Sequence, residues 1–356
     1  MYPLAENQTY PLNQWYIGAW SHEVSRTLTD RTILGEPVVF YRTEAGEPVA
    51  MAGLCPHRLY PLVKGTLVGD AVECGYHGLT FDCSGKCTRI PSQDGVPSRF
   101  ATKTFPVVER WQWIWIWMGD PALADPAKIP DTGRLGLGTE GWRADPTGTT
   151  HLNGRYQLLI DNLMDLSHIS YTHAVSLPGG SFIASIPAVL EEDGAALTVT
   201  RTFPPNPIDP FGQFLLPHVS GIVHNKLVSE YLGPCLINAA GPYITKVGEE
   251  HTYKVNFIHG CTPETPTSTH YFTAVSRNFR TDDEALSGML IAQMRQVLAE
   301  DIEPINLIEP NIERHADVKR ELSVPADAGA IRVRRRLSDQ IKAEQLGAVA
   351  VSAVNR

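Results

Sequence analysis

The chain has 356 residues, of which 43% are hydrophobic and 19% are charged, and its formal net charge is −9. This length is typical of two domains, and the composition excludes a largely disordered protein. The acidic balance argues against a non-specific nucleic-acid binder, which needs a basic face to neutralise phosphates.

The N-terminal sequence MYPLAENQTYPLNQWYIGAW has no basic region followed by an apolar one, so it is not typical of a signal peptide. No stretch approaches the ~20 uninterrupted apolar residues that span a bilayer. We therefore expect a cytoplasmic protein that does not bind membranes. In that compartment the six cysteines are expected to be metal ligands or buried thiols rather than disulfides.

The first third of the chain predicts β structure, because β-branched and apolar runs alternate with turn signals over residues 31–57. The stretch Trp111–Met118 is apolar at nearly every position and predicts a strand buried on both faces. The Pro-rich stretch Asp120–Gly133 follows it. We place the domain boundary there, with one domain over residues 1–130 and a second over residues 131–356.

The second part of the chain mixes helix and strand signals. Residues 155–174 have apolar positions at helical spacing, and residues 282–315 predict an amphipathic helix that Pro304 and Pro310 should kink or end. The remaining predicted elements are strands over residues 195–203, 251–260 and 270–279 and a last helix over residues 331–347.

Two short motifs, Cys55-Pro-His57 and Cys74-Gly-Tyr-His77, carry paired Cys and His residues. Four such ligands can bind structural zinc, but zinc sites usually pair Cys with Cys and His with His, whereas each motif here mixes the two. Mixing suits a Rieske [2Fe–2S] cluster, in which two Cys hold one iron and two His hold the other. We therefore predict that Cys55, His57, Cys74 and His77 bind such a cluster. Neutral imidazoles raise its reduction potential, as an electron relay requires.

A second constellation, Asp165-x-x-His168-x-x-x-x-His173, lies in the helical stretch 155–174. On an ideal helix the two His differ by ~140°, so they share one ion only if the helix has a π-bulge or ends near His173. Two His and one carboxylate form the facial triad of non-heme Fe(II). Spacing does not choose the acid among the candidates Glu300, Asp301, Glu303 and Asp282.

These motifs resemble those of the Rieske non-heme iron oxygenases, on the residues of segments 55–58, 74–78 and 161–173. The similarity is to the terminal oxygenases of the vanillate O-demethylase group, which includes dicamba monooxygenase and toluenesulfonate methyl-monooxygenase, and it covers nearly the whole chain. One local departure lies at Leu59 and Tyr60, where relatives commonly carry small residues.

The resemblance implies an α+β fold. An N-terminal all-β Rieske [2Fe–2S] domain would precede a C-terminal catalytic domain whose antiparallel sheet is flanked by helices (helix-grip type). It implies that Asp301 joins His168 and His173 as the third ligand of a mononuclear Fe(II). It also implies a homotrimer in which Asp165 links a Rieske histidine of one subunit to His168 of the next, with Asn162 close to the iron.

The activity implied by the resemblance is the O₂-dependent hydroxylation or O-demethylation of a small aromatic acid, such as a methoxy- or methylbenzoate, in aromatic degradation. Electrons would come from NADH through a separate flavin and iron–sulfur reductase, since the chain has no GxGxxG-type nucleotide loop in a strand–helix context. His259 is implied as a contact for the substrate carboxylate, with a solvent-facing histidine at a strand end as the alternative. Three other functions stay open: a ring-hydroxylating Rieske dioxygenase, a non-catalytic Rieske electron carrier and a zinc-stabilised binding module.

Overall fold

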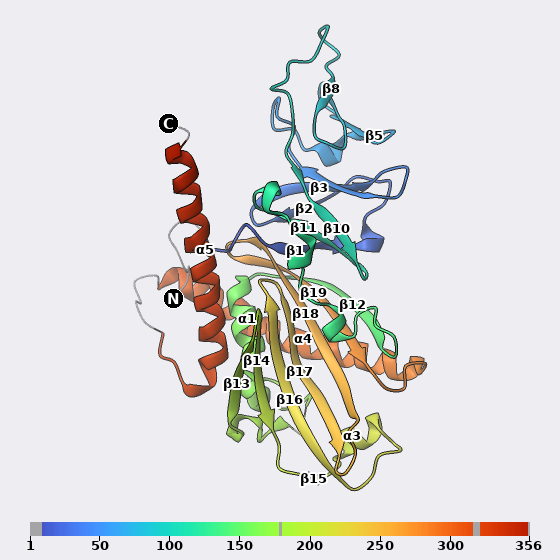
Figure 1. Cartoon of the computed structure of the whole chain (residues 1–356), viewed down its shortest axis with the longest axis vertical. Helices are drawn as coiled ribbons and strands as arrows, with labels where there is room; N and C mark the ends of the chain where they lie inside the picture. Colours follow the sequence, from blue (N-terminus) through green and yellow to red (C-terminus); the bar gives the residue numbers. More distant parts are fainter. Residues whose placement is uncertain (1–8, 178–179, 316–320, 355–356) are drawn as a thin grey trace. The chain divides into compact units, whose positions relative to one another are not determined.

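The computed structural model describes residues 9–177, 180–315 and 321–354. The described chain forms two compact units (Figure 1), of which one contains Tyr10–Ile129 together with Thr262–Pro266. The other unit contains Pro130–Cys261 and the residues that follow Pro266. Within the described ranges, no helix combines the length and the apolar character needed to cross a bilayer.

The N-terminal unit is built from three small β-sheets. The first pairs β1 (Trp15–Trp20) with β11 (Trp113–Trp117), which also pairs with β10 (Val107–Arg110). All five residues of β11 are buried, so the prediction of a strand buried on both faces is confirmed. The other two sheets have the orders β2 (Thr29–Ile33), β3 (Glu36–Arg42), β4 (Pro48–Ala52), β9 (Thr104–Phe105), and β5 (Thr66–Val68), β6 (Ala71–Glu73), β7 (Thr80–Phe81), β8 (Cys87–Arg89).

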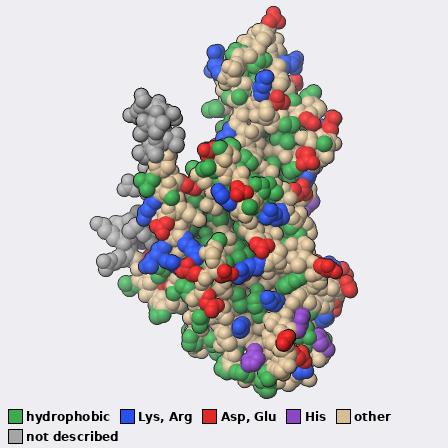
Figure 2. All heavy atoms as spheres, in the orientation of Figure 1, with side chains coloured by type: hydrophobic (Ala, Val, Ile, Leu, Met, Phe, Trp, Pro, Cys, Tyr) green, Lys and Arg blue, Asp and Glu red, His purple; other side chains and the backbone are tan. Residues whose placement is uncertain are grey.

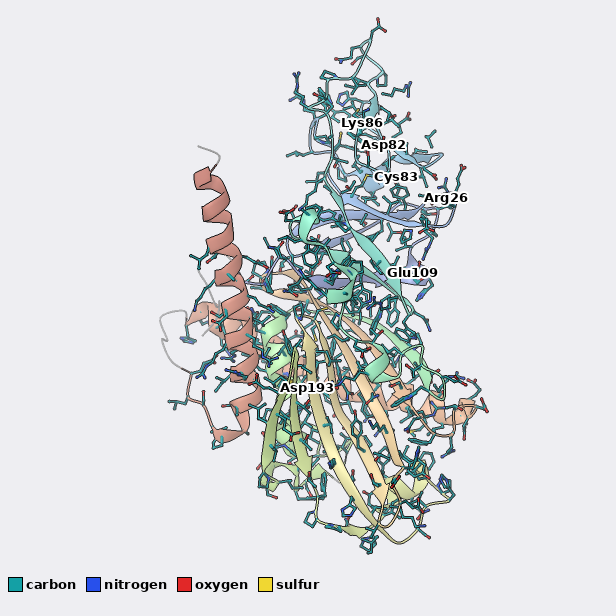
Figure 3. All side chains as sticks on the ribbon, viewed as in Figure 1. Arg26, Asp82, Cys83, Lys86, Glu109 and Asp193 are labelled. Carbon is teal, nitrogen blue, oxygen red and sulfur yellow. The ribbon has the colours of Figure 1, made fainter. Side chains whose placement is uncertain are left out.

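Several charged side chains of this unit form ion pairs at its surface. Arg42 donates to Glu109 at 2.8 Å, and Arg26 donates to Asp70 at 2.9 Å (Figure 3 labels Glu109 and Arg26). On the visible face of the molecule, acidic and basic side chains are interspersed rather than gathered by sign (Figure 2).

The C-terminal unit is organised around one eight-stranded sheet. Its strand order is β12 (Arg143–Leu152), β19 (Ser268–Arg277), β18 (Thr252–Thr265), β17 (Leu236–Lys246), β16 (Ile222–Gly233), β14 (Ala196–Thr202), β13 (Ala188–Asp193), with β15 (Asn206–Pro207) beside β16. The recorded pairings of β12 with β19, β16 with β17 and β17 with β18 are antiparallel. The three strands predicted from the sequence correspond to β14, β18 and β19.

Helices pack on this sheet, so the expected combination of an antiparallel sheet with helices is confirmed. The helix α1 (Tyr156–Met164) contacts β16 and β17, α4 (Glu284–Arg314) contacts β12 and β19, and α5 (Ala328–Val354) contacts β14. The side chain of Asp283 caps α4 by accepting a hydrogen bond from the N–H of Leu286 at 2.9 Å. Two further helices of this unit are short, α2 (Ile169–Thr172) and α3 (Pro210–Leu215).

Two helix predictions need correction. The stretch 155–174 is not one helix, because α1 ends at Met164 and Asp165 has extended backbone angles (φ −120°, ψ 102°). Conversely, α4 continues past both Pro304 and Pro310 to Arg314, so it does not end at either proline, which was one of the two outcomes expected there. A proline removes one backbone donor, but in a long helix packed on a sheet the neighbouring turns hold the helical backbone in place.

Candidate active site

The two Cys–His motifs form loops with the same backbone hydrogen-bond pattern. In each loop the N–H of the cysteine, Cys55 or Cys74, donates to the carbonyl five residues later. The N–H four residues after the cysteine donates back to its carbonyl, and all four N···O distances lie between 2.8 and 3.0 Å. That fourth position has a positive φ in both loops, +55° at Leu59 and +69° at Gly78. The unusual Leu59 therefore occupies a left-handed backbone, and its side chain is 68% exposed.

The four predicted cluster ligands are brought together by these loops. The side chains of Cys55 and Cys74 are buried, and the rings of His57 and His77 lie 4.6 Å apart between centroids. Burial, with a smaller effect of the neighbouring Cys74 thiol, raises the pKa of Cys55 to about 11. The Nδ1 atom of His57 is buried and has no hydrogen-bond partner among the described residues. Two adjacent thiols beside an orphaned imidazole nitrogen fit a [2Fe–2S] cluster.

The second predicted constellation also converges. One ligand atom from each of His168, His173 and Asp301 lies within 4.8 Å of the others. The Nε2 atoms of His168 and His173 lie 3.4 Å and 3.1 Å from Oδ1 of Asp301. Two imidazoles and one carboxylate with their donor atoms facing a common point fit the donor set of non-heme Fe(II).

The break after α1 makes this convergence possible. Asp165 ends α1 and caps the next turn, because its carboxylate accepts a hydrogen bond from the N–H of Ser167 at 2.9 Å. The chain then re-enters helical geometry through His168, and α2 ends at Thr172 with His173 just beyond it. The spacing of the two His required either a π-bulge or a helix end near His173, and the structure has a helix end.

Polar partners surround the triad. Asn162 donates to Oδ1 of Asp301 at 3.1 Å, and Nδ1 of His173 lies 2.7 Å from Oε2 of Glu300. The same Glu300 oxygen accepts a hydrogen bond from the hydroxyl of Ser176 at 2.6 Å. Glu300 was one of the four candidate acids for the third iron ligand. In the structure it is instead hydrogen-bonded to Nδ1 of His173, the ring nitrogen that faces away from Asp301.

The pKa shifts of these groups follow from the same contacts. Burial alone would raise the pKa of Asp301, but hydrogen bonds from His168 and His173 hold that pKa well below its usual range. Burial acts against the charged form of His173 as well, yet Asp301 and Glu300 raise its pKa overall. The hydrogen bonds from Ser176 and His173 outweigh burial at Glu300 and lower its pKa. The triad is therefore a strongly interacting set of charged and polar groups.

Asp165 makes contacts different from those implied by the resemblance. The Nδ1 atom of His168 lies 2.6 Å from the backbone carbonyl of Asp165, so the imidazole is oriented by the main chain rather than by the carboxylate. The carboxylate instead accepts hydrogen bonds from the Ser167 hydroxyl at 2.7 Å and from Arg201 at 3.0 Å. Within one chain, His168 therefore contacts the backbone carbonyl of Asp165 in place of the expected carboxylate.

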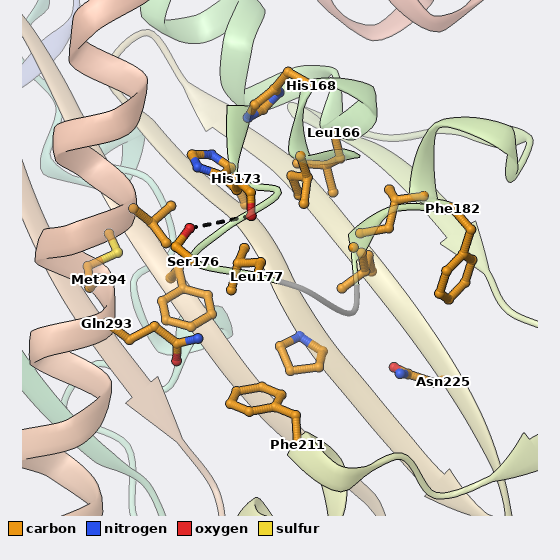
Figure 4. Close-up of a pocket in the computed structure, with 18 of the residues that line it drawn as sticks. Leu166, His168, His173, Ser176, Leu177, Phe182, Phe211, Asn225, Gln293 and Met294 are labelled. Carbon is orange, nitrogen blue, oxygen red and sulfur yellow. Dashed lines mark hydrogen bonds between the residues drawn. The ribbon is translucent and has the colours of Figure 1, made fainter. Parts of the chain in front are cut away.

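The triad lies at the edge of a pocket of about 700 Å³ (Figure 4). Its walls are mainly apolar, and Figure 4 shows His168 and His173 on one side with Phe211 and Asn225 on the other. A volume of this size accommodates a small aromatic ligand. The apolar lining residues include Leu163, Ile169, Phe182, Phe203, Leu227 and Phe257.

His259 also lines this pocket and is only 4% exposed, so the alternative of a solvent-facing histidine is wrong. Burial lowers the pKa of His259 to about 3, and the ring is therefore neutral at physiological pH. Its Nδ1 atom lies 2.6 Å from the hydroxyl of Tyr271, whose own pKa burial raises well above the usual value. Where the Tyr271 hydroxyl donates to Nδ1, the neutral ring carries its hydrogen on Nε2.

Comparison with known proteins identifies the family of this chain. Residues 152–343 match the vanillate O-demethylase oxygenase C-terminal domain, and residues 14–106 match the Rieske [2Fe–2S] domain. The chain belongs to the Rieske non-heme iron oxygenases. Like the other terminal oxygenases of this family, it uses a Rieske [2Fe–2S] cluster and a mononuclear non-heme iron, and the donor sets described above fit both groups.

Relatives of this Rieske oxygenase cover almost its whole length. It is 36% identical to the oxygenase component of chloroacetanilide N-alkylformylase from Rhizorhabdus wittichii, over 96% of this chain and 99% of that protein. It is 35% identical to the oxygenase component of dicamba O-demethylase from Stenotrophomonas maltophilia, over 96% and 99%. A crystal structure of dicamba monooxygenase bound to 3,6-dichlorosalicylic acid superposes with a TM-score of 0.83 at 31% identity, covering 94% of this chain and 98% of that one.

Two residues of this Rieske oxygenase site escaped the sequence analysis in their structural roles. Glu300 was considered only as an iron ligand, although its position directly before Asp301 was a signal that both acids reach the same site. Arg201 was seen only as part of a predicted strand. It is 2% exposed and binds the Asp165 carboxylate, and no local sequence pattern predicts this contact.

Proposed function

We propose that this terminal oxygenase binds iron through His168, His173 and Asp301 and its Rieske cluster through Cys55, His57, Cys74 and His77, and that it hydroxylates or O-demethylates a small aromatic substrate. The observation that carries this proposal is the meeting of the three donor side chains at the edge of an apolar pocket. An electron carrier needs neither the pocket nor the triad.

When bound, the iron supplies O₂-dependent oxidation of a substrate C–H bond. For a methoxyarene the overall reaction consumes O₂, two electrons and two protons and yields a phenol, formaldehyde and water. The protein contributes binding and exclusion of water, because the apolar walls surround a substrate while His168 and His173 stand at one side. Asn162 keeps the Asp301 carboxylate in one orientation through its hydrogen bond.

The substrate class that we propose is an aromatic acid, as the resemblance implies. A carboxylate accepts hydrogen bonds, and the proton on Nε2 of His259 is a donor from the pocket wall. Asn225 lines the same pocket and offers an amide that donates from its nitrogen. The relatives named for dicamba and for chloroacetanilide act on different aromatic compounds. We therefore propose that the residues of the pocket wall determine which aromatic compound this protein accepts.

We also propose a homotrimer in which electrons pass from the cluster of one subunit to the iron of the next. The cluster loops end in exposed side chains, with Tyr76 59% exposed and Leu59 68% exposed, and the segment carrying the two iron-binding His exposes Tyr171 (80%) and Val175 (90%). Apolar side chains at both places suit contact with a second copy of the chain. Asp165 would then bridge the two centres, with its backbone carbonyl on Nδ1 of His168 and its carboxylate towards a Rieske histidine of the next copy.

The source of electrons is proposed to be NADH, through a separate flavin and iron–sulfur reductase, in the cytoplasm. We further propose that the functional boundary between the Rieske domain (residues 1–130) and the catalytic domain (residues 131–356) falls in the Pro-rich stretch around Pro130.

The test is a screen of methoxylated and methylated benzoates with the reconstituted protein, a generic reductase and NADH. We expect formaldehyde in proportion to NADH consumed with at least one methoxy compound. The His168→Ala variant should keep the reddish-brown cluster, lose one iron per chain and release no formaldehyde. The matched control is His315→Ala, which removes an exposed histidine at the end of α4.

Formaldehyde release by His168→Ala at the wild-type rate would contradict the site assignment. A colourless protein without iron after anaerobic reconstitution would contradict the proposal as a whole. Conversion of the aromatic ring to a cis-diol, with no formaldehyde from any methoxy compound, would favour the dioxygenase alternative.

A further inference from the structure

The carboxylate of Glu300 lies against the ring of His173, beside the nitrogen that does not face Asp301. Each imidazole has two nitrogens, and in this structure Nε2 of His173 faces Asp301 while Nδ1 lies 2.7 Å from Glu300. A carboxylate accepts only, so Nδ1 carries a hydrogen, and when a metal replaces the hydrogen on Nε2 that atom presents its lone pair. The tautomer that a metal requires is thereby fixed.

The second iron-binding histidine is held differently. The Nδ1 atom of His168 lies 2.6 Å from a neutral backbone carbonyl, that of Asp165. Both rings therefore present Nε2 to the same point, but only His173 is backed by a charged acceptor. A hydrogen bond to a carboxylate makes an imidazole a stronger electron donor than one to a carbonyl, so the two histidines are unequal ligands.

Glu300 itself is held in place by a second donor. The Ser176 hydroxyl donates to the same Oε2 atom at 2.6 Å, so one oxygen of the carboxylate receives both hydrogen bonds. Ser176 lines the substrate pocket, whereas the Glu300 side chain is 27% exposed. The carboxylate is thus fixed between the pocket wall and the ring of His173, which is 1% exposed.

Charge balance gives this arrangement a further consequence. Asp301 supplies one negative charge from a side chain that is 4% exposed, and a divalent iron beside it would leave one positive charge uncompensated. Glu300 directly precedes Asp301 on α4. Its carboxylate supplies the second negative charge, on the side of His173 that faces away from Asp301. Buried charges are stabilised when they are paired, so the Glu300 carboxylate favours the occupied state of the site.

We propose that Glu300 is a positioning residue of the iron site, which orients His173 and neutralises the second charge of the bound Fe(II), and that Ser176 holds it there. This inference rests on the proposed assignment of His168, His173 and Asp301 as iron ligands. It goes beyond that assignment because Glu300 is not one of the three proposed ligands and does not line the pocket.

The test measures retention of the mononuclear iron by the holoenzyme. Under anaerobic conditions, excess Fe(II) chelator is added and loss of iron is followed, while the visible absorption of the Rieske cluster serves as an internal standard of intact protein. We expect Glu300→Gln, which keeps an oxygen acceptor but removes the charge, to lose this iron roughly 10-fold faster than wild type. Glu300→Ala, which removes both, should lose it roughly 100-fold faster.

The control is Glu303→Gln, which removes the same charge from an exposed position nearby on the same helix. Its rate of iron loss should equal that of the wild type. Ser176→Ala should fall between the wild type and Glu300→Gln, since the carboxylate keeps its contact with His173 but loses one donor. Equal iron loss by Glu303→Gln and Glu300→Gln would overturn the proposal, because only the total charge of the helix would then matter.

A second measurement separates charge balance from simple packing. Removal of the negative charge should shift the reduction potential of the mononuclear iron to a more positive value in Glu300→Gln, with the thermal unfolding midpoint unchanged. An unchanged potential together with unchanged iron retention in Glu300→Gln would overturn the role of Glu300. A wild-type protein that holds only the cluster iron would instead overturn the assignment of the triad, so the two failures are distinguishable.

Discussion

The guanidinium of Arg201 donates to the carboxylate of Asp165 at 3.0 Å, which ties β14 to the break between α1 and the segment that carries His168. The same side chain donates to the carbonyls of Ile183 and Ile186. Ile183 lines the pocket, so one buried arginine connects the pocket wall to the helix break. The position of His168 therefore depends on a residue 33 positions later in the chain.

Replacing Arg201 by Gln should destabilise the protein strongly. The substitution removes the charged partner of the Asp165 carboxylate and the donor of two carbonyls in a mostly buried place, for which the expected loss is about 3 kcal/mol of the free energy of unfolding. The control is Arg332→Gln, whose ion pair with Glu192 lies at the surface and should change stability by less than about 1 kcal/mol. Thermal unfolding of both variants makes the comparison, and equal midpoints would contradict it.

The Asp165→Asn variant should retain both metal centres. His168 is oriented by the backbone carbonyl of residue 165, which the substitution leaves in place, so iron content should match the wild type. If the carboxylate bridges the cluster and the iron of neighbouring subunits, re-reduction of the mononuclear iron should slow by orders of magnitude. Stopped-flow absorption of the cluster measures this rate, and a wild-type rate would exclude the bridging role.

Electron transfer between subunits has its own test by mixing two inactive variants. Cys55→Ser should lack the cluster and His168→Ala should lack the mononuclear iron. If a ring of three subunits transfers electrons across each interface, random mixed rings should recover about a quarter of the wild-type activity. Rings re-formed from equal amounts of the two variants are assayed for formaldehyde, and no recovery would mean that electrons stay within one chain.

The paired cluster loops allow a comparison of equivalent positions. Gly78 has φ +69°, and a Cβ atom there would lie 2.9 Å from Cγ of Pro91, so Gly78→Ala should cost about 1–2 kcal/mol. Leu59 already occupies the corresponding left-handed conformation with a side chain, so Leu59→Ala should change stability by less than about 0.5 kcal/mol. Thermal midpoints and cluster absorption report the result; equal effects would refute the equivalence of the loops.

His259 predicts a dependence of stability on pH. Its pKa is lowered to about 3 by burial, whereas an unfolded histidine titrates near 6.5, so below about pH 6.5 the unfolded state binds the extra proton. The contribution of His259 to stability is therefore constant above that pH and falls by about 1.4 kcal/mol per pH unit as pH decreases towards 3. His259→Gln should lose less stability than the wild type between pH 7 and pH 5, measured by thermal unfolding. Identical losses would show that His259 is not buried in its neutral form.

The sequence was sufficient where a motif is local. The mixed Cys–His pairs predicted one set of ligands, and the apolar stretch Trp111–Met118 predicted a buried strand, which the structure has at Trp113–Trp117. The spacing of His168 and His173 even predicted that a regular helix could not serve both. It did not predict where the helix would break, because that depends on the contact of Asp165 with the distant Arg201.

Contacts between distant segments account for the remaining gaps. Spacing alone could not distinguish Asp301 from Glu300, since both acids approach His173 and only the three-dimensional position of the ring decides which nitrogen each acid meets. The strands β16 and β17 were missed because a strand in the middle of a packed sheet is defined by its neighbours as much as by its own residues. Pro304 and Pro310 suggested that the helix could end at either position, but packing keeps α4 continuous to Arg314.

The continuity of α4 has one further consequence, for insertions and deletions. Its first turns are fastened to the sheet, with Ser287 donating to Asp145 at 2.8 Å and Arg295 donating to the Thr147 carbonyl at 3.0 Å. Removing a single residue between these anchors and Glu300 would rotate everything after it by about 100° and shift it by about 1.5 Å along the axis. Asp301 and Glu300 would both turn away from His173, although no side chain of the site had been replaced. Insertions and deletions in natural variants of this enzyme should therefore occur in its loops, while the number of residues in α4 between Arg295 and Glu300 stays constant.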